Sequence, residues 1–119
     1  MAYVDGYLLP VPKKNVAAYK KMATMGCKVW MDHGALDYRE CIGEDLKSKW
    51  GIPFPKQMKL KASETVAFSW IVFKSKAHRN KVNAAVMKDA RIAGMMNMKK
   101  MPFDPKRMCY GGFTSIVAK

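Results

Sequence analysis

Residues 65–73 read TVAFSWIVF, and this run decides the fold class. Branched and aromatic residues fill it, as is typical of a β-strand. Successive side chains of a strand point to opposite faces, so one face carries Val66, Phe68, Trp70 and Val72, and the other carries Ala67, Ser69, Ile71 and Phe73. Both faces are apolar, which predicts a central strand and leaves open which face the helices cover.

Outward from this strand, the hydrophobic pattern predicts a β-α-β-β-α-β order of elements. Strands are expected at residues 3–9, 36–42 and 108–117. Asn15 is expected to cap a helix that ends near His33, before Gly34, and Ser75 to cap a second helix that reaches about residue 88. A short helix is expected at 90–96, a long connection spans 44–63, and Gly111–Gly112 indicates a β-bulge. Residues 1–119 are interpreted as one domain.

This order predicts an α+β fold, a ferredoxin-like four-stranded antiparallel sheet in which the first and third strands are central. Both helices pack on one face of such a sheet, and the chain offers no third long helix for the other face. The uncovered face of the third strand would then be a large exposed apolar patch. A second copy of the chain is the simplest cover, so we expect a homodimer with twofold symmetry.

Four stretches carry a resemblance to a known family: YVDGYLLPVPKKN (3–15), HGALDY (33–38), ETVAFSWI (64–71) and MPFDPKRMCYGGF (101–113). They span nearly the whole chain, which resembles the YbaA-like family of uncharacterised bacterial proteins, a domain of unknown function. The resemblance implies a ferredoxin-like fold in the dimeric α/β-barrel superfamily. It implies no established activity.

Aromatic, histidine and arginine side chains are the candidates for a ligand pocket between the sheet and the helices. Trp30 and His33 share the apolar stripe of the first helix, and His33 is either an orienting group or a helix-terminal histidine. Arg107 is interpreted as a carboxylate fork or as part of a salt-bridged turn. The full set of predicted pocket residues is Tyr7, Trp30, His33, Trp70, His78 and Arg107.

Trp70 and His78 are similar in kind to a strand tryptophan and helix histidine used by heme-degrading monooxygenases of the same superfamily. The asparagine that those enzymes carry on the first strand is replaced here by Gly6 and Tyr7. We therefore expect no cofactor, and two histidines without a cysteine pattern predict no metal site. Methionines 95, 96, 98 and 101 are interpreted as core filling or as a flexible pocket wall.

The net charge and the absence of targeting signals limit the partners, the localisation and the functions to be considered. Twenty-two basic and nine acidic residues give a net charge of +13, which predicts at most non-specific binding to polyanions and otherwise a solvated surface. Three widely spaced cysteines, no signal-peptide pattern and no long apolar run favour a cytoplasmic protein. Three functions stay open: a small-molecule pocket with binding or cofactor-independent catalysis, a nucleic-acid-binding module, and a dimeric interaction or stress protein.

Overall fold

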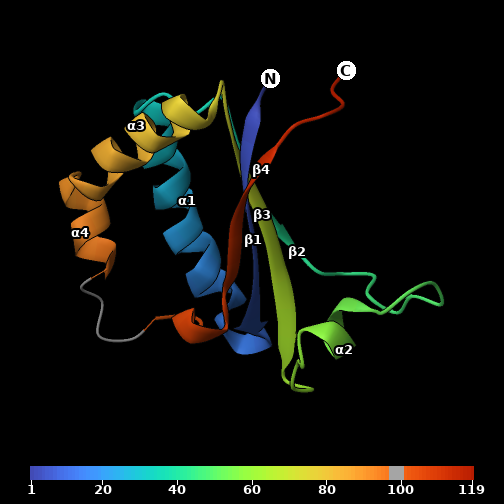
Figure 1. Cartoon of the computed structure of the whole chain (residues 1–119). Coiled ribbons are helices and arrows are strands. Elements are labelled where there is room, and N and C mark those ends of the chain that lie inside the picture. Colours follow the sequence, from blue (N-terminus) through green and yellow to red (C-terminus); the bar gives the residue numbers. More distant parts are fainter. Residues whose placement is uncertain (97–100) are drawn as a thin grey trace.

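The structure is a computed structural model that describes residues 1–96 and 101–119 (Figure 1). Short 3-10 turns at Lys13–Asn15 and Pro105–Arg107 flank the main elements. The helices and strands follow the predicted order: β1 (Tyr3–Pro12), α1 (Val16–Asp32), β2 (Asp37–Ile42), α2 (Phe54–Gln57), β3 (Glu64–Phe73), α3 (Lys76–Met87), α4 (Ala90–Met96) and β4 (Cys109–Thr114).

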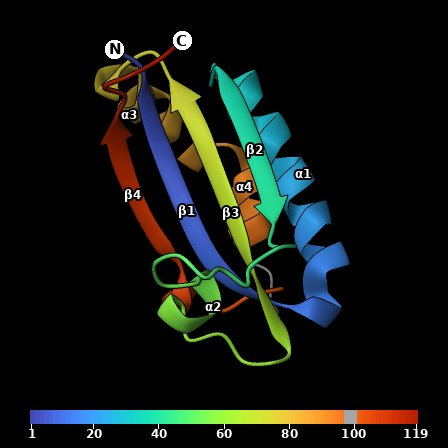
Figure 2. The same cartoon turned by 90° about the vertical axis from the view of Figure 1, so that its right-hand side faces the viewer.

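The four strands form one antiparallel sheet in the order β2-β3-β1-β4, which confirms the central position of β1 and β3 (Figure 2). β1 is longer than predicted, because it continues through Pro10 to Pro12. Pairing with β4 stops at Leu8, opposite Cys109. Beyond that point β3 is the only described strand that pairs with β1, and a strand with one free side tolerates proline.

The helices α1, α3 and α4 all cover the same face of the sheet (Figure 1). The β3 residues on this covered face are Ala67, Ser69, Ile71 and Phe73, each of which is buried. Phe68 and Trp70 therefore lie on the opposite, open face, where Phe68 is 47% exposed. The choice left open by the sequence is thus decided: the face with the smaller residues Ala67 and Ser69 lies against the helices.

The helix ends confirm two of the three predicted signals. Gly34 follows α1 with a φ of 109°, a conformation that glycine adopts at no steric cost. The Ser75 hydroxyl accepts a hydrogen bond from the His78 N–H and caps α3. The capping role of Asn15 is wrong: Asn15 precedes α1, but its side-chain amide donates to the Pro102 carbonyl oxygen at 3.1 Å.

β4 ends at Thr114 and is shorter than predicted. The expected bulge is also wrong, because Gly111 and Gly112 pair in continuous register with Gly6 and Asp5. A Cβ atom at Gly112 would collide with the ring of Tyr3. The glycine therefore provides room for a neighbouring aromatic ring instead of an extra residue in the strand.

The connection between β2 and β3 lies on the open side of the sheet and crosses its lower end (Figures 1 and 2). It contains the short helix α2 and exposes large apolar side chains, among them Trp50, which is 89% exposed. Within the described residues, no helix has the length and apolar character that crossing a bilayer requires.

Candidate functional site

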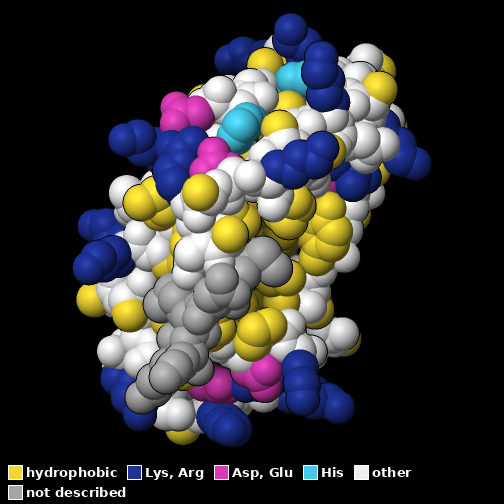
Figure 3. Space-filling model, turned by 90° about the vertical axis from the view of Figure 1, so that its left-hand side faces the viewer, with side chains coloured by type: hydrophobic (Ala, Val, Ile, Leu, Met, Phe, Trp, Pro, Cys, Tyr) yellow, Lys and Arg dark blue, Asp and Glu magenta, His cyan; other side chains and the backbone are white. Residues whose placement is uncertain are grey.

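A cavity of about 150 Å³ lies between the covered face of the sheet and α1. The core is divided into two hydrophobic clusters, one around Phe73 and Val86 and the other around Leu9 and Val11. The cavity lies where these clusters meet, since its lining includes Ile71 from the first and Leu9 from the second. In Figure 3, hydrophobic side chains gather near the middle of this helix-bearing face.

The cavity wall is mostly apolar, with a few polar groups contributed by the sheet and α1. Its apolar part comes from both the sheet and the helices and includes Leu9, Met22, Ala23, Gly26, Trp30, Ile71, Met95, Phe103 and Met108. Its polar part is Tyr7, Tyr19, Tyr38, Glu40 and Ser69. This combination of apolar surface and a small number of polar groups is typical of small-molecule sites.

Glu40 is the only residue with a charged side chain among the described residues that line this cavity. It accepts hydrogen bonds from two phenols, the Tyr19 hydroxyl at 2.6 Å and the Tyr38 hydroxyl at 2.8 Å. Burial raises the pKa of Tyr19, and the hydrogen bond to Glu40 raises it further. Burial and the nearby Glu40 charge raise the pKa of Tyr38 in the same direction. Both phenols therefore stay neutral and donate to the carboxylate.

Tyr7 approaches the cavity from the central strand β1. Burial raises the pKa of its hydroxyl, and the negative charge of Asp5 raises it further. Its ring packs against Tyr110 with a centroid distance of 4.9 Å. Within the described part of the chain the Tyr7 hydroxyl makes no hydrogen bond, so it is a neutral donor that a bound molecule could use.

A groove of about 300 Å³ adjoins the cavity along the edge of the sheet, between α1 and β2. Cavity and groove share Tyr19, Ala23, Tyr38 and Glu40, so the carboxylate and its two phenols form the boundary between them. Cys27 lines the groove, and burial raises the pKa of its thiol. A thiol of raised pKa is a poor nucleophile, so we assign no covalent chemistry to Cys27.

A second polar cluster connects the cavity wall to a buried carboxylate. Trp30, which lines the cavity, donates from its indole Nε1 to the Asn83 Oδ1 at 3.0 Å. The Asn83 amide donates in turn to the Asp5 Oδ2 at 3.3 Å. The Asp5 side chain is fully buried, and the Arg79 Nε lies 3.5 Å from its Oδ1. Arg79 also donates to the Tyr3 hydroxyl at 3.0 Å.

Of the six residues predicted for a pocket, Tyr7 and Trp30 line the cavity. The prediction that Trp70 lines the same pocket is wrong, because Trp70 lies on the open face of the sheet. There the centroid of its ring lies 5.2 Å from that of Phe68. It follows that Trp70 and His78 do not face one another as the comparison with heme-degrading enzymes required. An even-numbered residue of β3 cannot share a face with the odd-numbered residues that face α1.

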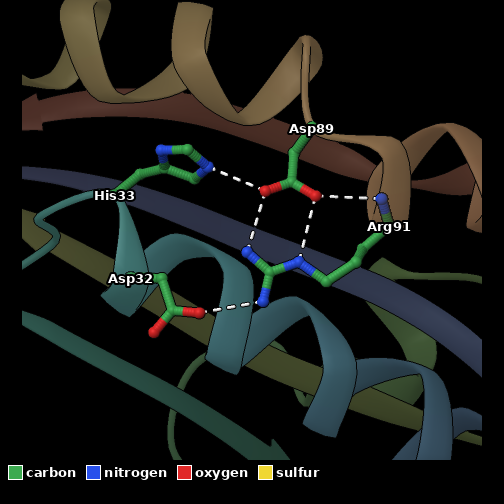
Figure 4. A network of polar contacts seen from close by, with 4 residues as sticks. All are labelled: Asp32, His33, Asp89 and Arg91. Carbon is green, nitrogen blue, oxygen red and sulfur yellow. Dashed lines mark hydrogen bonds and ion pairs between the residues drawn. The ribbon is translucent and has the colours of Figure 1, made fainter.

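His33 belongs to an ion-pair network at the end of α1 (Figure 4). Its Nε2 lies 2.8 Å from the Asp89 Oδ2. Arg91 donates to both oxygens of Asp89, at 3.0 and 2.8 Å, and to the Asp32 Oδ2 at 2.8 Å. Asp89 precedes α4, so this network joins the C-terminal end of α1 to the turn between α3 and α4. It gives His33 a structural partner outside the cavity.

The remaining predicted residues also have structural partners. The His78 Nδ1 accepts the Lys74 N–H at 3.0 Å, and its ring contacts Phe73 edge-on. Arg107 donates to the Glu64 Oε2 at 2.6 Å and to the Lys59 carbonyl oxygen at 3.1 Å. That pairing agrees with a salt-bridged turn before β4. Within residues 1–96 and 101–119, no three His, Cys, Asp or Glu side chains are placed to hold a metal ion.

The sequence interpretation missed Glu40, Tyr19 and Tyr38 as a group. A signal was available, since Glu40 alternates with Tyr38 and Ile42 on the apolar side of its strand. Glu40 is exposed and needs no partner, but its place next to Tyr38 on one strand face indicated that a carboxylate and a phenol could meet there. Of the methionines considered, Met95 lines the cavity. Met98 and the side chain of Met96 lie outside the described residues.

We predict that Asp89→Asn weakens the fold in a pH-dependent manner. The hydrogen bonds from Arg91, and next the one to His33, hold the pKa of the Asp89 carboxyl well below its usual range. A carboxyl whose pKa is lowered by folding contributes stability above its unfolded pKa of about 4, and this contribution is lost as the pH falls through the folded pKa. Urea unfolding should show Asp89→Asn to be less stable than the natural protein at pH 5, with the difference narrowing below about pH 4.

The exposed Asp45→Asn is the matched control and should show no such difference at either pH. If Asp89→Asn unfolds at the same urea concentration as the natural protein at pH 5, the network contributes nothing to stability.

Comparison with known proteins identifies the family. The model of the family described as "Protein of unknown function (DUF1428)" matches residues 2–105. "Uncharacterized protein YbaA" of Escherichia coli strain K12 is 38% identical over 117 residues, which cover 98% of both chains, and the protein of the same name from Shigella flexneri matches equally. These findings confirm the resemblance seen in the sequence.

Among solved structures, the chain is similar to a mutant form of SnoaB, "a cofactor-independent oxygenase from Streptomyces nogalater". The TM-score is 0.54 at 10% identity, covering 98% of this chain and 95% of that one, which supports the α+β fold. The family match and the identity to YbaA, each over most of the chain, show that the protein belongs to the DUF1428 family of proteins of unknown function.

Proposed function

We propose that the protein binds a small, largely apolar molecule in the cavity between the sheet and α1. The observation that carries this proposal is the apolar wall of a cavity of about 150 Å³ that also presents Tyr7 and Glu40. A volume of that size with apolar walls is large enough for a molecule such as benzene. The cavity is partly open to solvent, so a molecule can enter it without unfolding the core.

Binding is better supported than catalysis by the geometry around Glu40. Both of its carboxylate oxygens already accept a phenol hydrogen, which suits a group that orients a ligand. The likeness to SnoaB, which is described as a cofactor-independent oxygenase, concerns the fold. Cofactor-independent catalysis in the same cavity remains the alternative, and turnover of a bound ligand would favour it.

Titration with benzyl alcohol tests the proposal through the methionine methyl groups, which NMR resolves in protein labelled at those methyls. We expect the resonances of Met22, Met95 and Met108 to shift, because these residues line the cavity. Met31 and Met87 are exposed elsewhere and should stay unchanged. Absence of any shift in the cavity methionines at millimolar ligand would contradict the proposal.

Ala23→Leu should weaken this binding at least about tenfold, because the larger side chain fills the space that the ligand needs. Ala23 lines the cavity, whereas the exposed Ala84 of α3 offers a matched change away from it. Ala84→Leu should bind as the natural protein does. Equal loss of binding in both variants would show that the effect does not arise in the cavity.

A second copy of the chain is the partner that we propose for the open face of the sheet. Phe68 and Phe113 protrude there and are 47% and 61% exposed. Between them, over Gly6 and Gly111, lies a hollow of about 250 Å³. Protruding rings and a hollow on one surface can fit each other across a twofold axis. The connection that carries Trp50 lies on the same side (Figure 1) and could contact the partner.

For the basic surface we propose nothing beyond non-specific attraction of polyanions. On the helix-bearing face, lysine and arginine side chains lie scattered around the rim and do not form a single stripe (Figure 3). A nucleic-acid-binding face usually shows clustered basic residues. The face shown in Figure 3 thus adds no support to nucleic-acid binding, which stays a prediction from the net charge of +13.

A further inference from the structure

We propose that Asn83 is a positioning residue that fixes the ring of Trp30 in the cavity wall, and that the cavity therefore prefers a flat aromatic ring to a saturated ring. This inference rests on the proposed ligand-binding function and deepens it by naming the class of ligand. Asn83 belongs to α3 and is not among the described residues that line the cavity. Its contact with the site is its hydrogen bond to Trp30.

The orientation of the Trp30 ring is the first step. Its indole Nε1–H, which is the only polar group of the side chain, donates to the Asn83 Oδ1 at 3.0 Å. The benzene part of the same ring lies beside Gly26, where an added Cβ atom would be 3.8 Å from the Trp30 Cζ3. Gly26 lines the cavity, as Trp30 does. The polar edge of the indole is thus held by α3, while the apolar part lies at the cavity.

The second step is that Asp5 fixes the orientation of the Asn83 amide. The Asn83 Nδ2 donates to the Asp5 Oδ2 at 3.3 Å. Asp5 is fully buried, and the Arg79 Nε lies 3.5 Å from its other oxygen. An ionised carboxylate only accepts hydrogen bonds, so Asn83 turns its NH₂ group toward Asp5 and its oxygen toward Trp30. A rotated amide would set two donors against each other at Trp30.

The aromatic side chains around the cavity indicate the class of ligand. The ring centroids of Trp30 and Tyr38 are 6.2 Å apart with their planes tilted by 44°, and those of Tyr19 and Phe103 are 5.8 Å apart in an edge-on arrangement. All four residues line the cavity. Aromatic rings in tilted or edge-on contact attract each other beyond the effect of burying their area. A flat aromatic ligand gains this attraction, and a saturated ring does not.

This gain depends on the orientation of Trp30. Without the Asn83 oxygen the indole N–H loses its partner, and the ring can turn to find another. A ligand must then order the Trp30 side chain when it binds, which lowers its affinity. The aromatic ligand loses more than the saturated one, because only its contact with Trp30 depends on the angle between two rings.

Benzyl alcohol and cyclohexylmethanol test this inference, because they carry the same group on a flat and on a saturated ring. Isothermal titration measures both affinities, and the difference in their water–octanol partition is subtracted. We expect the natural protein to favour benzyl alcohol by about three- to tenfold beyond that difference. Asn83→Leu should reduce this preference to about twofold or less. Asn80→Leu, an exposed change on the same helix, should leave it unchanged.

The preference between the two alcohols separates positioning from a merely structural role. A general loss of stability would weaken the binding of both alcohols alike and leave their ratio as it was. If Asn83→Leu retains the full preference, Asn83 does not position Trp30 for the ligand. If the natural protein shows no preference beyond partition, the class of ligand is wrong while the ligand-binding function stands. If neither alcohol binds and the cavity methionines do not respond, the function is wrong and this inference with it.

The indole N–H of Trp30 gives a test that needs no variant, and it decides the positioning role if Asn83→Leu does not fold. Trp50 is 89% exposed and serves as the internal reference. In natural protein transferred to heavy water, NMR should show the Trp30 indole hydrogen exchanging at least about tenfold more slowly than that of Trp50, because a hydrogen bond must open before exchange. Equal exchange rates would overturn the positioning role.

Discussion

Arg79→Met should destabilise the protein by about 3–5 kcal/mol, because it leaves a buried carboxylate without its counter-charge. The Asp5 side chain is fully buried on the central strand β1, and the Arg79 side chain is 19% exposed. Asn83 donates one hydrogen bond to Asp5 and Arg79 supplies the only positive charge next to it among the described residues. Urea unfolding followed by circular dichroism, at constant protein concentration, measures the loss.

A double variant distinguishes the lost ion pair from lost packing. Asp5→Asn combined with Arg79→Met removes both charges and should be more stable than Arg79→Met alone, since the buried charge is gone. Arg39→Met is the matched control, because Arg39 and its partner Asp37 are largely exposed, and it should change stability by about 1 kcal/mol or less. An equally small effect at Arg79 would mean that the buried pair does not support the fold.

Phe68→Asp should convert the proposed homodimer into monomers. It places an unpaired carboxylate at the centre of the open face, and burying one in an interface costs about 4 kcal/mol, which raises the dissociation constant roughly a thousandfold. Light scattering coupled to size exclusion should report twice 13.5 kDa for the natural protein and 13.5 kDa for the variant. Phe68 is 47% exposed in a single chain, so the protomer itself should remain folded.

Met87→Asp is the matched control for this change. Met87 is 53% exposed on α3, which lies on the helix-bearing side, away from the open face. This variant should keep the mass of the natural protein. A natural protein that is monomeric at micromolar concentration would remove both the dimer and the role assigned to the open face.

Periodicity alone was sufficient for the order of elements and the central strands. The alternation at 65–73 and the stripe that includes Tyr19 and Trp30 depend on the fixed geometry of strands and helices, which is local. Gly34 and Ser75 mark helix ends because their conformation and hydrogen bonding act within one turn. Asn15 was misjudged for the opposite reason: its amide bonds to Pro102, a residue 87 positions away.

The presence of each strand was easier to predict than which of its two faces lies against the helices. Trp70 and Phe73 both belong to apolar faces of β3, and composition does not say which set lies against α1. The structure places Ala67 and Ser69 under the helix, where small side chains permit close packing, and leaves Trp70 on the open face. Because the helices cover that face, Trp70 lies outside the cavity, whereas Tyr7 and Trp30 line it.

The sequence by itself determined the fold class, the family and a large apolar surface that one chain leaves uncovered. Only the tertiary structure decided which polar groups meet: Glu40 with Tyr19 across α1 and β2, His33 with Asp89, and Arg79 with Asp5. Local patterns fix the conformation of each segment, since they depend on neighbours within a few residues. Partners that lie many positions apart are chosen by strand register and helix packing, which bring a carboxylate within hydrogen-bonding distance of a donor that no local pattern indicates.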